Sequence, residues 1–218
     1  MPDVIYGVDV SSYQGEIDWE QVKAAGIAFV VCKASEGGTA SPDRVAYFKQ
    51  AVKGAHEAGL LVSGYHFYRG SADPYVQAEV FFDAVCQCQY EMDFCGALDV
   101  ETTDNTSRSY LSQTVAQCMQ SITDKWGKHP MLYSYVSFLE NSLDLSYFGG
   151  YPRWVADWGW CEIEIPGVPD WECELPSGWS YTDCWQYSES GVVAGVGGPV
   201  DLDLYWGSAE QLKELGSF

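Results

Sequence analysis

Residues 97–101 read Ala-Leu-Asp-Val-Glu, an apolar run that carries two carboxylates separated by one valine. Successive side chains of a β-strand point to opposite faces, so Asp99 and Glu101 share one face, about 6.6 Å apart at about 3.3 Å per residue. Burial of one unpaired carboxylate is costly, and burial of two close together costs more. We therefore expect Leu98 and Val100 to face the packed side of a strand, while the two acids face an open mouth.

The chain before and after this stretch alternates between strand and helix patterns as far as residue 135. Helix starts are marked by Asp18, which Gln21 follows as in a capping box, and by the pairs 41–42 and 73–74, each an N-cap residue followed by proline. The continuous apolar run 27–33 is typical of a strand that is covered on both faces. The expected strands are 4–10, 27–33, 60–68, 95–101 and 131–135, and the expected helices are 18–25, 41–58, 73–90 and 107–126.

The second half of the chain follows a different pattern. Strands are expected at 153–156, 183–187 and 200–204, with little helical pattern between them, and proline and glycine are dense in 166–178. A last helix is expected at 208–216. This order predicts an α/β fold, a TIM-barrel-like (β/α) barrel whose later helices are lost or shortened, in a single domain over 1–218.

The overall charge excludes one class of partner. The formal net charge is −20, so we expect no nucleic-acid binding. No apolar stretch is long enough to span a bilayer, and we expect no membrane insertion. The first residues lack the basic start and apolar stretch of a signal peptide, so we expect action without classical secretion or a chain that has been processed.

The eight cysteines do not settle the compartment in which the protein works. A bridge between Cys161 and Cys173 is conceivable. The Cys86–Cys88 pair has no convincing second pair with metal-ligand spacing, and we expect neither a metal nor a cofactor.

Acidic residues gather where the expected strands end. Active sites of parallel barrels lie at the carboxyl ends of the strands, so acids at these positions are informative. The acids at or near the ends of expected strands, or within the last of them, are Asp9, Asp99, Glu101, Asp157, Asp201 and Asp203.

The pair in ALDVE suits one kind of chemistry. Two nearby carboxylates disfavour double ionisation, so the pKa of one of them is raised, and a protonated acid beside an ionised carboxylate is what glycoside hydrolysis requires. Glu101 has the longer reach and is the better proton donor, with Asp99 as its ionised partner. A metal site, an ion pair with Lys33 or Arg69, and a solvated loop remain open as alternatives.

Aromatic residues are abundant, with nine Trp and fifteen Tyr. Their faces suit the apolar faces of sugar rings, although packing in the core is an equally good explanation for each ring. The rings that we expect at a sugar-binding groove are Tyr65, Phe67, Tyr68, Tyr133, Trp154 and Trp185, with Tyr13 less firmly supported.

Seven segments in order resemble those of the family 25 glycoside hydrolases, the N-acetylmuramidase lysozymes. The segments are GVDVSSYQGEIDW (7–19), FVVCKASEG (29–37), GYHFY (64–68), ALDVE (97–101), LYSY (132–135), RWVADW (153–158) and CWQYSESGVVAGVGGPVDLDLY (184–205). The resemblance implies a flattened barrel of eight strands. It also implies cleavage of the β-1,4 bond between N-acetylmuramic acid and N-acetylglucosamine in bacterial peptidoglycan.

The resemblance also assigns roles to the strand-end acids. Glu101 would be the general acid, and Asp99 would stabilise the intermediate that forms when the substrate's N-acetyl carbonyl attacks C1. Asp9 and Asp201 would orient the site and hold the proton on Glu101, with Asp203 as the substitute for Asp201. Direct attack by water would need the same carboxylates at a wider spacing and stays open.

Other residues are expected to contact the substrate or support the site. Lys33 would meet the lactyl carboxylate of muramic acid or form an ion pair with Asp9 or Asp99. Asp157 is expected near the sugar, and His66 is expected to form hydrogen bonds in the barrel wall.

Two other functions stay open at this point. One is a chitinase-like hydrolase of N-acetylglucosamine polymers, which the acid pair alone would allow. The other is a non-catalytic peptidoglycan-binding relative, which the presence of all four acids disfavours. The expected partner is the glycan strand of peptidoglycan, and a monomeric catalytic domain is expected, with a longer parent chain and a separate wall-binding module as an option. The protein would act outside the cell or at the bacterial wall. It would reach the wall either through a holin pore, as a phage lysin does, or by secretion with a leader that has since been removed.

Overall fold

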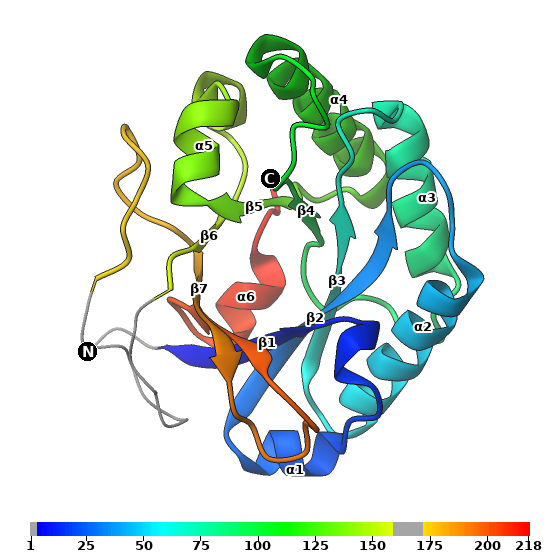
Figure 1. Ribbon diagram of the computed structural model, residues 1–218. Coiled ribbons are helices and arrows are strands. Elements are labelled where there is room, and N and C mark those ends of the chain that lie inside the picture. Colours follow the sequence, from blue (N-terminus) through cyan, green and yellow to red (C-terminus); the bar gives the residue numbers. More distant parts are fainter. Residues whose placement is uncertain (1–3, 159–171) are drawn as a thin grey trace.

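Eight strands close into a barrel in chain order, from β1 to β8 (Figure 1). The computed structural model describes residues 4–158 and 172–218. This closed barrel confirms the expected fold class. The strands are β1 (Ile5–Val10), β2 (Ile27–Glu36), β3 (Leu61–Phe67), β4 (Ala97–Asp99), β5 (Met131–Tyr135), β6 (Arg153–Ala156), β7 (Cys184–Gly191) and β8 (Val200–Tyr205).

The last strand runs against the others. Neighbouring strands from β1 to β7 are parallel, whereas β8 is antiparallel to both β7 and β1. The beginning of β8 therefore lies at the same end of the barrel as the carboxyl ends of the other strands. For this reason Asp201, the second residue of β8, is the register partner of Asp9 near the end of β1.

Most of the helical structure lies in the first half of the chain, where α2, α3 and α4 cover the outside of the barrel (Figure 1). Among the described residues the second half contributes two short helices, which agrees with the expected shortening. The helices are α1 (Trp19–Ala24), α2 (Pro42–Glu57), α3 (Pro74–Cys86), α4 (Arg108–Trp126), α5 (Val136–Ser142) and α6 (Ala209–Glu214), with short 3-10 turns η1 (Ser12–Gln14) and η2 (Leu145–Phe148).

The helix ends follow the local chemistry of the sequence. Asp18 caps α1 by accepting a hydrogen bond from the Gln21 amide, and Asp73 caps α3 by accepting from two amides. Gly127 ends α4 in the left-handed conformation at φ 72°, which favours glycine. The expected end of α3 near residue 90 is wrong, because the chain leaves the helix after Cys86 and Tyr90 stacks on His56, with ring centres 4.0 Å apart.

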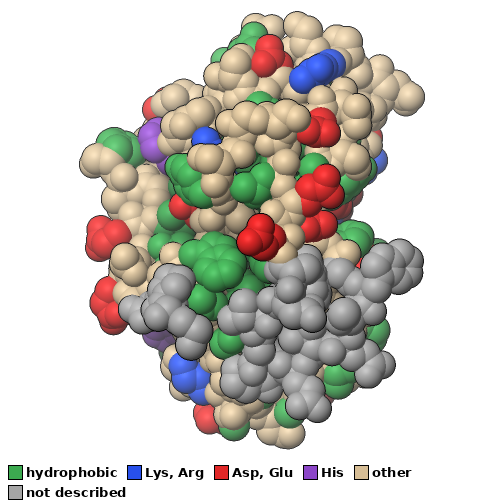
Figure 2. All heavy atoms as spheres, turned by 90° about the vertical axis from the view of Figure 1, so that its left-hand side faces the viewer, with side chains coloured by type: hydrophobic (Ala, Val, Ile, Leu, Met, Phe, Trp, Pro, Cys, Tyr) green, Lys and Arg blue, Asp and Glu red, His purple; other side chains and the backbone are tan. Residues whose placement is uncertain are grey.

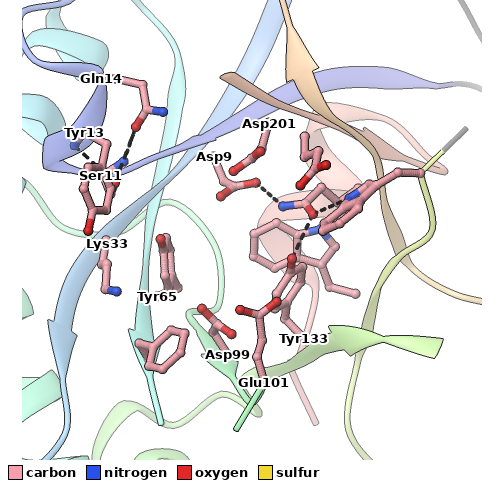
Figure 3. Close-up of a pocket in the computed structure, with 15 residues that line it drawn as sticks. Asp9, Ser11, Tyr13, Gln14, Lys33, Tyr65, Asp99, Glu101, Tyr133 and Asp201 are labelled. Carbon is pink, nitrogen blue, oxygen red and sulfur yellow. Dashed lines mark hydrogen bonds between the residues drawn. The ribbon is translucent and has the colours of Figure 1, made fainter. Parts of the chain in front are cut away.

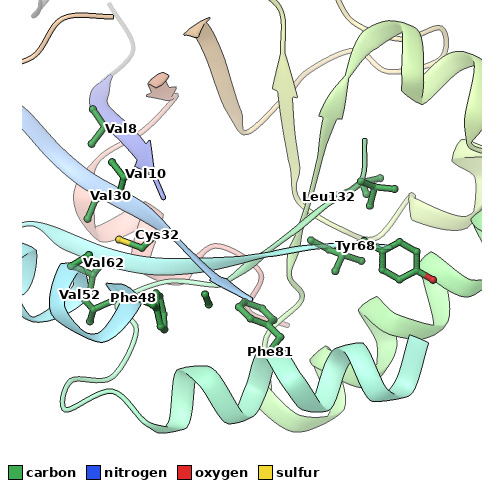
Figure 4. Close-up of a cluster of buried hydrophobic side chains, with 14 of the residues drawn as sticks. Val8, Val10, Val30, Cys32, Phe48, Val52, Val62, Tyr68, Phe81 and Leu132 are labelled. Carbon is green, nitrogen blue, oxygen red and sulfur yellow. The ribbon is translucent and has the colours of Figure 1, made fainter. Parts of the chain in front are cut away.

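The strand at ALDVE is oriented as its sequence pattern predicts. Leu98 and Val100 are fully buried in the apolar layer beneath the helices, while Asp99 and Glu101 line a cavity inside the barrel. The same alternation holds in β1, where Val8 joins that layer and Asp9 faces inward. Figure 4 shows this layer, with residues of β1, β2 and β3 next to residues of α2 and α3.

The cysteines whose placement is described are all free thiols, and Cys32, Cys95, Cys118 and Cys184 are buried. Cys161 lies outside the described residues, and Cys173, its conceivable partner, is a free thiol that carries no bridge in this structure. No helix in the described part of the chain is long and apolar enough to span a membrane.

Candidate active site

An open cavity of about 270 Å³ lies at the end of the barrel where β1 to β7 finish and β8 begins (Figure 3). Parallel barrels bring the ends of different strands together at one mouth, so residues far apart in sequence meet here. The residues that line it are Asp9, Ser11, Tyr13, Gln14, Lys33, Tyr65, Phe67, Asp99, Glu101, Tyr133, Trp154, Trp158, Gln186, Glu189 and Asp201.

Asp99 and Glu101 form the acid pair of the cavity. Asp99 is 5% exposed, and its Oδ1 atom has no hydrogen-bond partner among the described residues. Burial, followed by the nearby charge of Glu101, raises the pKa of Asp99 well above its usual value. Burial also raises the pKa of Glu101, against the opposing effect of the Lys33 cation. The pair therefore holds a proton more tightly than two exposed carboxyl groups would.

A second group of acids lies across the cavity from this pair. Asp9 and Asp201 line the cavity and are hydrogen-bonded to each other, while Asp203 is fully buried behind them. Burial and the nearby Asp9 carboxyl group raise the pKa of Asp201 to about 9, and burial followed by the charge of Asp203 raises the pKa of Asp9 well above its usual value, so the Asp9–Asp201 pair holds a proton at neutral pH. Asp203 Oδ1 accepts a hydrogen bond from Trp154 Nε1 at 2.9 Å.

Gln186 joins these acids to the aromatic wall, and the sequence analysis did not identify it. Its Nε2 donates to Asp9 Oδ2 at 2.7 Å, and its Oε1 accepts from Tyr133 Oη at 2.8 Å and from Trp158 Nε1 at 2.9 Å. Only 2% of Gln186 is exposed. A signal was present in the sequence, because Gln186 is the single amide between two buried aromatic residues of β7 and so points to the opposite face.

Lys33 faces the mouth but pairs with a residue that the sequence analysis missed. Its Nζ lies 3.0 Å from Glu36 Oε2 and 4.4 Å from the centre of the Phe67 ring. The suggested ion pair of Lys33 with Asp9 or Asp99 is therefore wrong in this structure. Lys33 still acts on the acid pair at longer range, since its charge lowers the pKa of Asp99 and Glu101.

Four of the predicted sugar-contacting rings line the cavity, namely Tyr65, Phe67, Tyr133 and Trp154. Tyr68 and Trp185 do not, and at 0% and 1% exposure both lie in the core. Direct sugar contact is wrong for these two rings, because each follows or precedes an inward-facing residue and so points outward. Tyr13, which is 93% exposed, and Trp158, which the sequence analysis missed, lie at the rim.

Two further polar residues support the wall of the barrel. Asp157 is not among the residues that line the cavity, and its carboxylate accepts a hydrogen bond from the Glu174 amide at 2.7 Å, so its predicted sugar contact stays a prediction. His66 forms hydrogen bonds in the barrel wall as expected, with Ser35 Oγ at 2.8 Å and Gln77 Oε1 at 3.2 Å. Burial lowers the pKa of His66 to about 4, so the ring is neutral.

Comparisons with known proteins agree with this fold. The family model "Glycosyl hydrolases family 25" matches residues 8–196. Lysozyme M1 of Streptomyces globisporus is 32% identical over 225 residues, which cover 98% of this chain and 71% of that protein. The uncharacterized protein YegX of Escherichia coli K12 is 32% identical over 214 residues, covering 96% and 72%. The structure of the bacterial lysozyme from Streptomyces coelicolor superposes with a TM-score of 0.74 at 27% identity, covering 97% and 96%. This chain belongs to glycosyl hydrolases family 25.

Proposed function

We propose that this chain hydrolyses the β-1,4 bond between N-acetylmuramic acid and N-acetylglucosamine in bacterial peptidoglycan. Family membership and the relatives named lysozyme support this proposal. The observation that carries it is the pair of carboxyl groups, Asp99 and Glu101, which line one open cavity and both have raised pKa values. A carboxyl group that keeps its proton beside a carboxylate is the arrangement that glycoside hydrolysis requires.

Glu101 acts as the general acid in the proposed mechanism. It gives its proton to the glycosidic oxygen as the bond from that oxygen to C1 breaks. The carbonyl oxygen of the N-acetyl group on the same sugar bonds to C1 and yields a cyclic cation. Water then attacks C1, and the bond from C1 to the carbonyl oxygen breaks, which restores the N-acetyl group. The attacking water passes a proton to the Glu101 carboxylate and so restores the acid.

Asp99 stabilises the charge that develops on the sugar. Its Oδ1 atom is buried without a partner among the described residues, so it can accept the N–H of the substrate's N-acetyl group. A hydrogen bond to an ionised acceptor is strong, and it strengthens as positive charge builds up on the donor. This contact also holds the carbonyl oxygen in line with C1.

Asp9 and Asp201 keep the opposite wall of the cavity polar without two full negative charges. The pair holds a proton, and both residues remain within reach of a sugar hydroxyl in the cavity. The aromatic rings of Tyr65 and Phe67 supply apolar faces for the sugar. Figure 2 shows acidic and hydrophobic side chains side by side on one face of the molecule, and few basic ones.

Digestion of purified peptidoglycan tests the proposal. Mass spectrometry after borohydride reduction distinguishes the products, and we expect reduced muramic acid at the new ends. New ends that carry only reduced N-acetylglucosamine would contradict the proposal. Cleavage of chitin oligomers with no action on peptidoglycan would instead support the chitinase-like alternative, which the same acid pair permits. Because the proposed substrate is the cell wall, we also propose that the protein acts at the bacterial wall or outside the cell.

A further inference from the structure

The chain turns sharply soon after Glu101, in the connection between β4 and α4. Asp104 and Asn105 both have left-handed backbone conformations, at φ 46° and 63°. Residues other than glycine adopt this conformation only at a cost, and two in succession are rare. Strain of this kind persists where surrounding contacts hold it, and it gathers at functional sites. The contacts that hold this turn therefore bear on the position of Glu101.

Both carboxylate oxygens of Asp104 are engaged. Asp104 Oδ1 accepts a hydrogen bond from Thr102 Oγ1 at 3.2 Å, and the Asp104 amide donates back to Thr102 Oγ1 at 3.2 Å. Asp104 Oδ2 lies 3.3 Å from Arg69 Nε and accepts from Ser71 Oγ at 3.5 Å. Only 13% of the Asp104 side chain is exposed. The carboxylate therefore ties the turn to the connection between β3 and α3.

Arg69 is itself fixed by a buried side chain of α3. Its amide donates to Gln77 Oε1 at 2.8 Å, and its carbonyl oxygen accepts from Gln77 Nε2 at 3.0 Å. Gln77 is fully buried and also forms a hydrogen bond with His66 of β3. The next residue, Gly70, packs directly on the turn, since a Cβ atom there would lie 2.7 Å from Thr103 O. The turn thus rests on a part of the barrel that has little freedom to move.

Glu101 depends on this turn for its position. The sheet holds the chain as far as Val100, whose amide donates to Tyr133 O at 3.0 Å and whose carbonyl oxygen accepts from Ser134 Oγ at 2.6 Å. Glu101 follows directly and lies between these contacts with β5 and the turn. Its carboxyl group points into the cavity beside Asp99 (Figure 3). A shift of the turn would therefore move this carboxyl group relative to Asp99.

We propose that the ion pair of Arg69 with Asp104 positions Glu101 for proton transfer by holding the turn that follows it. Neither partner is among the residues that line the cavity, so both are positioning residues. Displacement of a catalytic group by about 1 Å can cost about 100-fold in rate. An ion pair near the surface contributes little to stability, so its effect should appear in the rate. The inference rests on the proposed function for the identity of Glu101 as the acid.

Kinetics on soluble peptidoglycan fragments test this role. Asp104→Asn keeps an oxygen for Thr102 and tolerates the left-handed backbone, but its NH₂ group meets the N–H of Arg69 Nε, which is also a donor. We expect kcat to fall about tenfold while KM changes by less than about twofold. Arg69→Met should give the same loss. The double variant should lose no more than either single variant, because both substitutions remove the same contact.

Arg44→Met is the matched control for Arg69→Met. The guanidinium groups of Arg44 and Arg69 both lie near the Glu36 carboxylate, at 3.3 and 3.9 Å. Among the described residues, only Arg69 forms an ion pair with Asp104. Loss of a positive charge beside Glu36 is therefore common to both variants, and we expect Arg44→Met to leave kcat unchanged.

A measurement without substrate separates this inference from the proposed function. In protein with ¹³C-labelled glutamate carboxyl groups, Glu101→Gln assigns the Glu101 signal. This signal should move or broaden in Asp104→Asn and in Arg69→Met, because the turn no longer holds the side chain in one place. The signal should keep its position and width in Arg44→Met.

Three kinetic outcomes would overturn the inference. They are an unchanged kcat in both single variants, losses that add in the double variant, and a raised KM at unchanged kcat, which would make Arg69 a substrate contact. If Asp104→Asn does not fold, the comparison of Arg69→Met with Arg44→Met decides the matter. If the wild type cleaves no peptidoglycan, the proposed function fails, and an unmoved Glu101 signal would still refute this inference.

Discussion

Asp201 is the carboxyl group whose replacement gives the clearest test of the site's electrostatics. Burial and the Asp9 carboxylate raise the pKa of Asp201 from 3.8 to about 9, so the folded protein binds a proton at pH 7 that the unfolded chain releases. Stability from such a group is fully present below the unfolded pKa and declines as pH rises toward the folded pKa. Asn resembles the protonated acid in shape and needs no proton, so Asp201→Asn should stabilise the protein more at pH 7 than at pH 4.5.

The size of the effect follows from the two pKa values. Each pH unit above the unfolded pKa lowers the free energy of unfolding of the wild type by about 1.4 kcal/mol. Asp201→Asn avoids this loss, so its expected gain in stability is at most about 4 kcal/mol at pH 7 and about 1 kcal/mol at pH 4.5. These are upper limits, because Asp201 is partly exposed and shares its proton with Asp9. Active-site residues often lower stability in return for activity, so wall lysis should fall in the more stable Asp201→Asn variant.

Urea unfolding of the wild type and Asp201→Asn at the two pH values measures this effect. Asp83→Asn is the control, since Asp83 is an exposed carboxylate on α3, and its free energy of unfolding should change by less than about 0.5 kcal/mol at either pH. The electrostatic reasoning is wrong if Asp201→Asn destabilises the protein at pH 7. It is also wrong if the change in stability is the same at both pH values.

Two further predictions concern residues around the acid pair and the rim. Lys33→Met removes the cation that lowers the pKa of Asp99 and Glu101, so the alkaline limb of the pH–rate profile on peptidoglycan should move to higher pH; an unmoved limb would contradict the assigned influence of Lys33. Tyr13→Ala should raise KM without lowering Tm, because the Tyr13 ring is 93% exposed at the rim. Tyr68→Ala should instead lower the free energy of unfolding by about 3 kcal/mol or more, because the Tyr68 ring is fully buried. Equal KM effects from the two variants would refute this separation.

The barrel could be predicted from local patterns because each element carries its own signal. The caps at Asp18 and Asp73 and the apolar run that contains Phe29 act within a few residues, so they can be read without knowledge of the fold. Helix α5 was missed because seven residues with two buried side chains, Phe138 and Leu139, are too short to show helical periodicity.

The site could be predicted only as far as its acids. Strand alternation puts Asp99 and Glu101 on the inner face of the barrel, and the same alternation turns the rings of Tyr68 and Trp185 outward into the core, where a match to sugar-binding aromatic residues is misleading. Hydrogen bonds that cross the barrel, such as the bond from Gln186 to Asp9, join residues 177 positions apart and have no local sequence signal. The direction of β8 was equally inaccessible, because antiparallel pairing depends on how the whole barrel closes.

Release of reducing ends from purified peptidoglycan by Glu101→Gln, compared with the wild type, tests the central claim most directly. Gln keeps the shape of the side chain but has no acidic proton, so hydrolysis should fall by about 10³-fold or more, while binding to insoluble peptidoglycan persists. Hydrolysis by Glu101→Gln at a rate near that of the wild type would show that Glu101 is not the general acid, and the account of this site would be wrong.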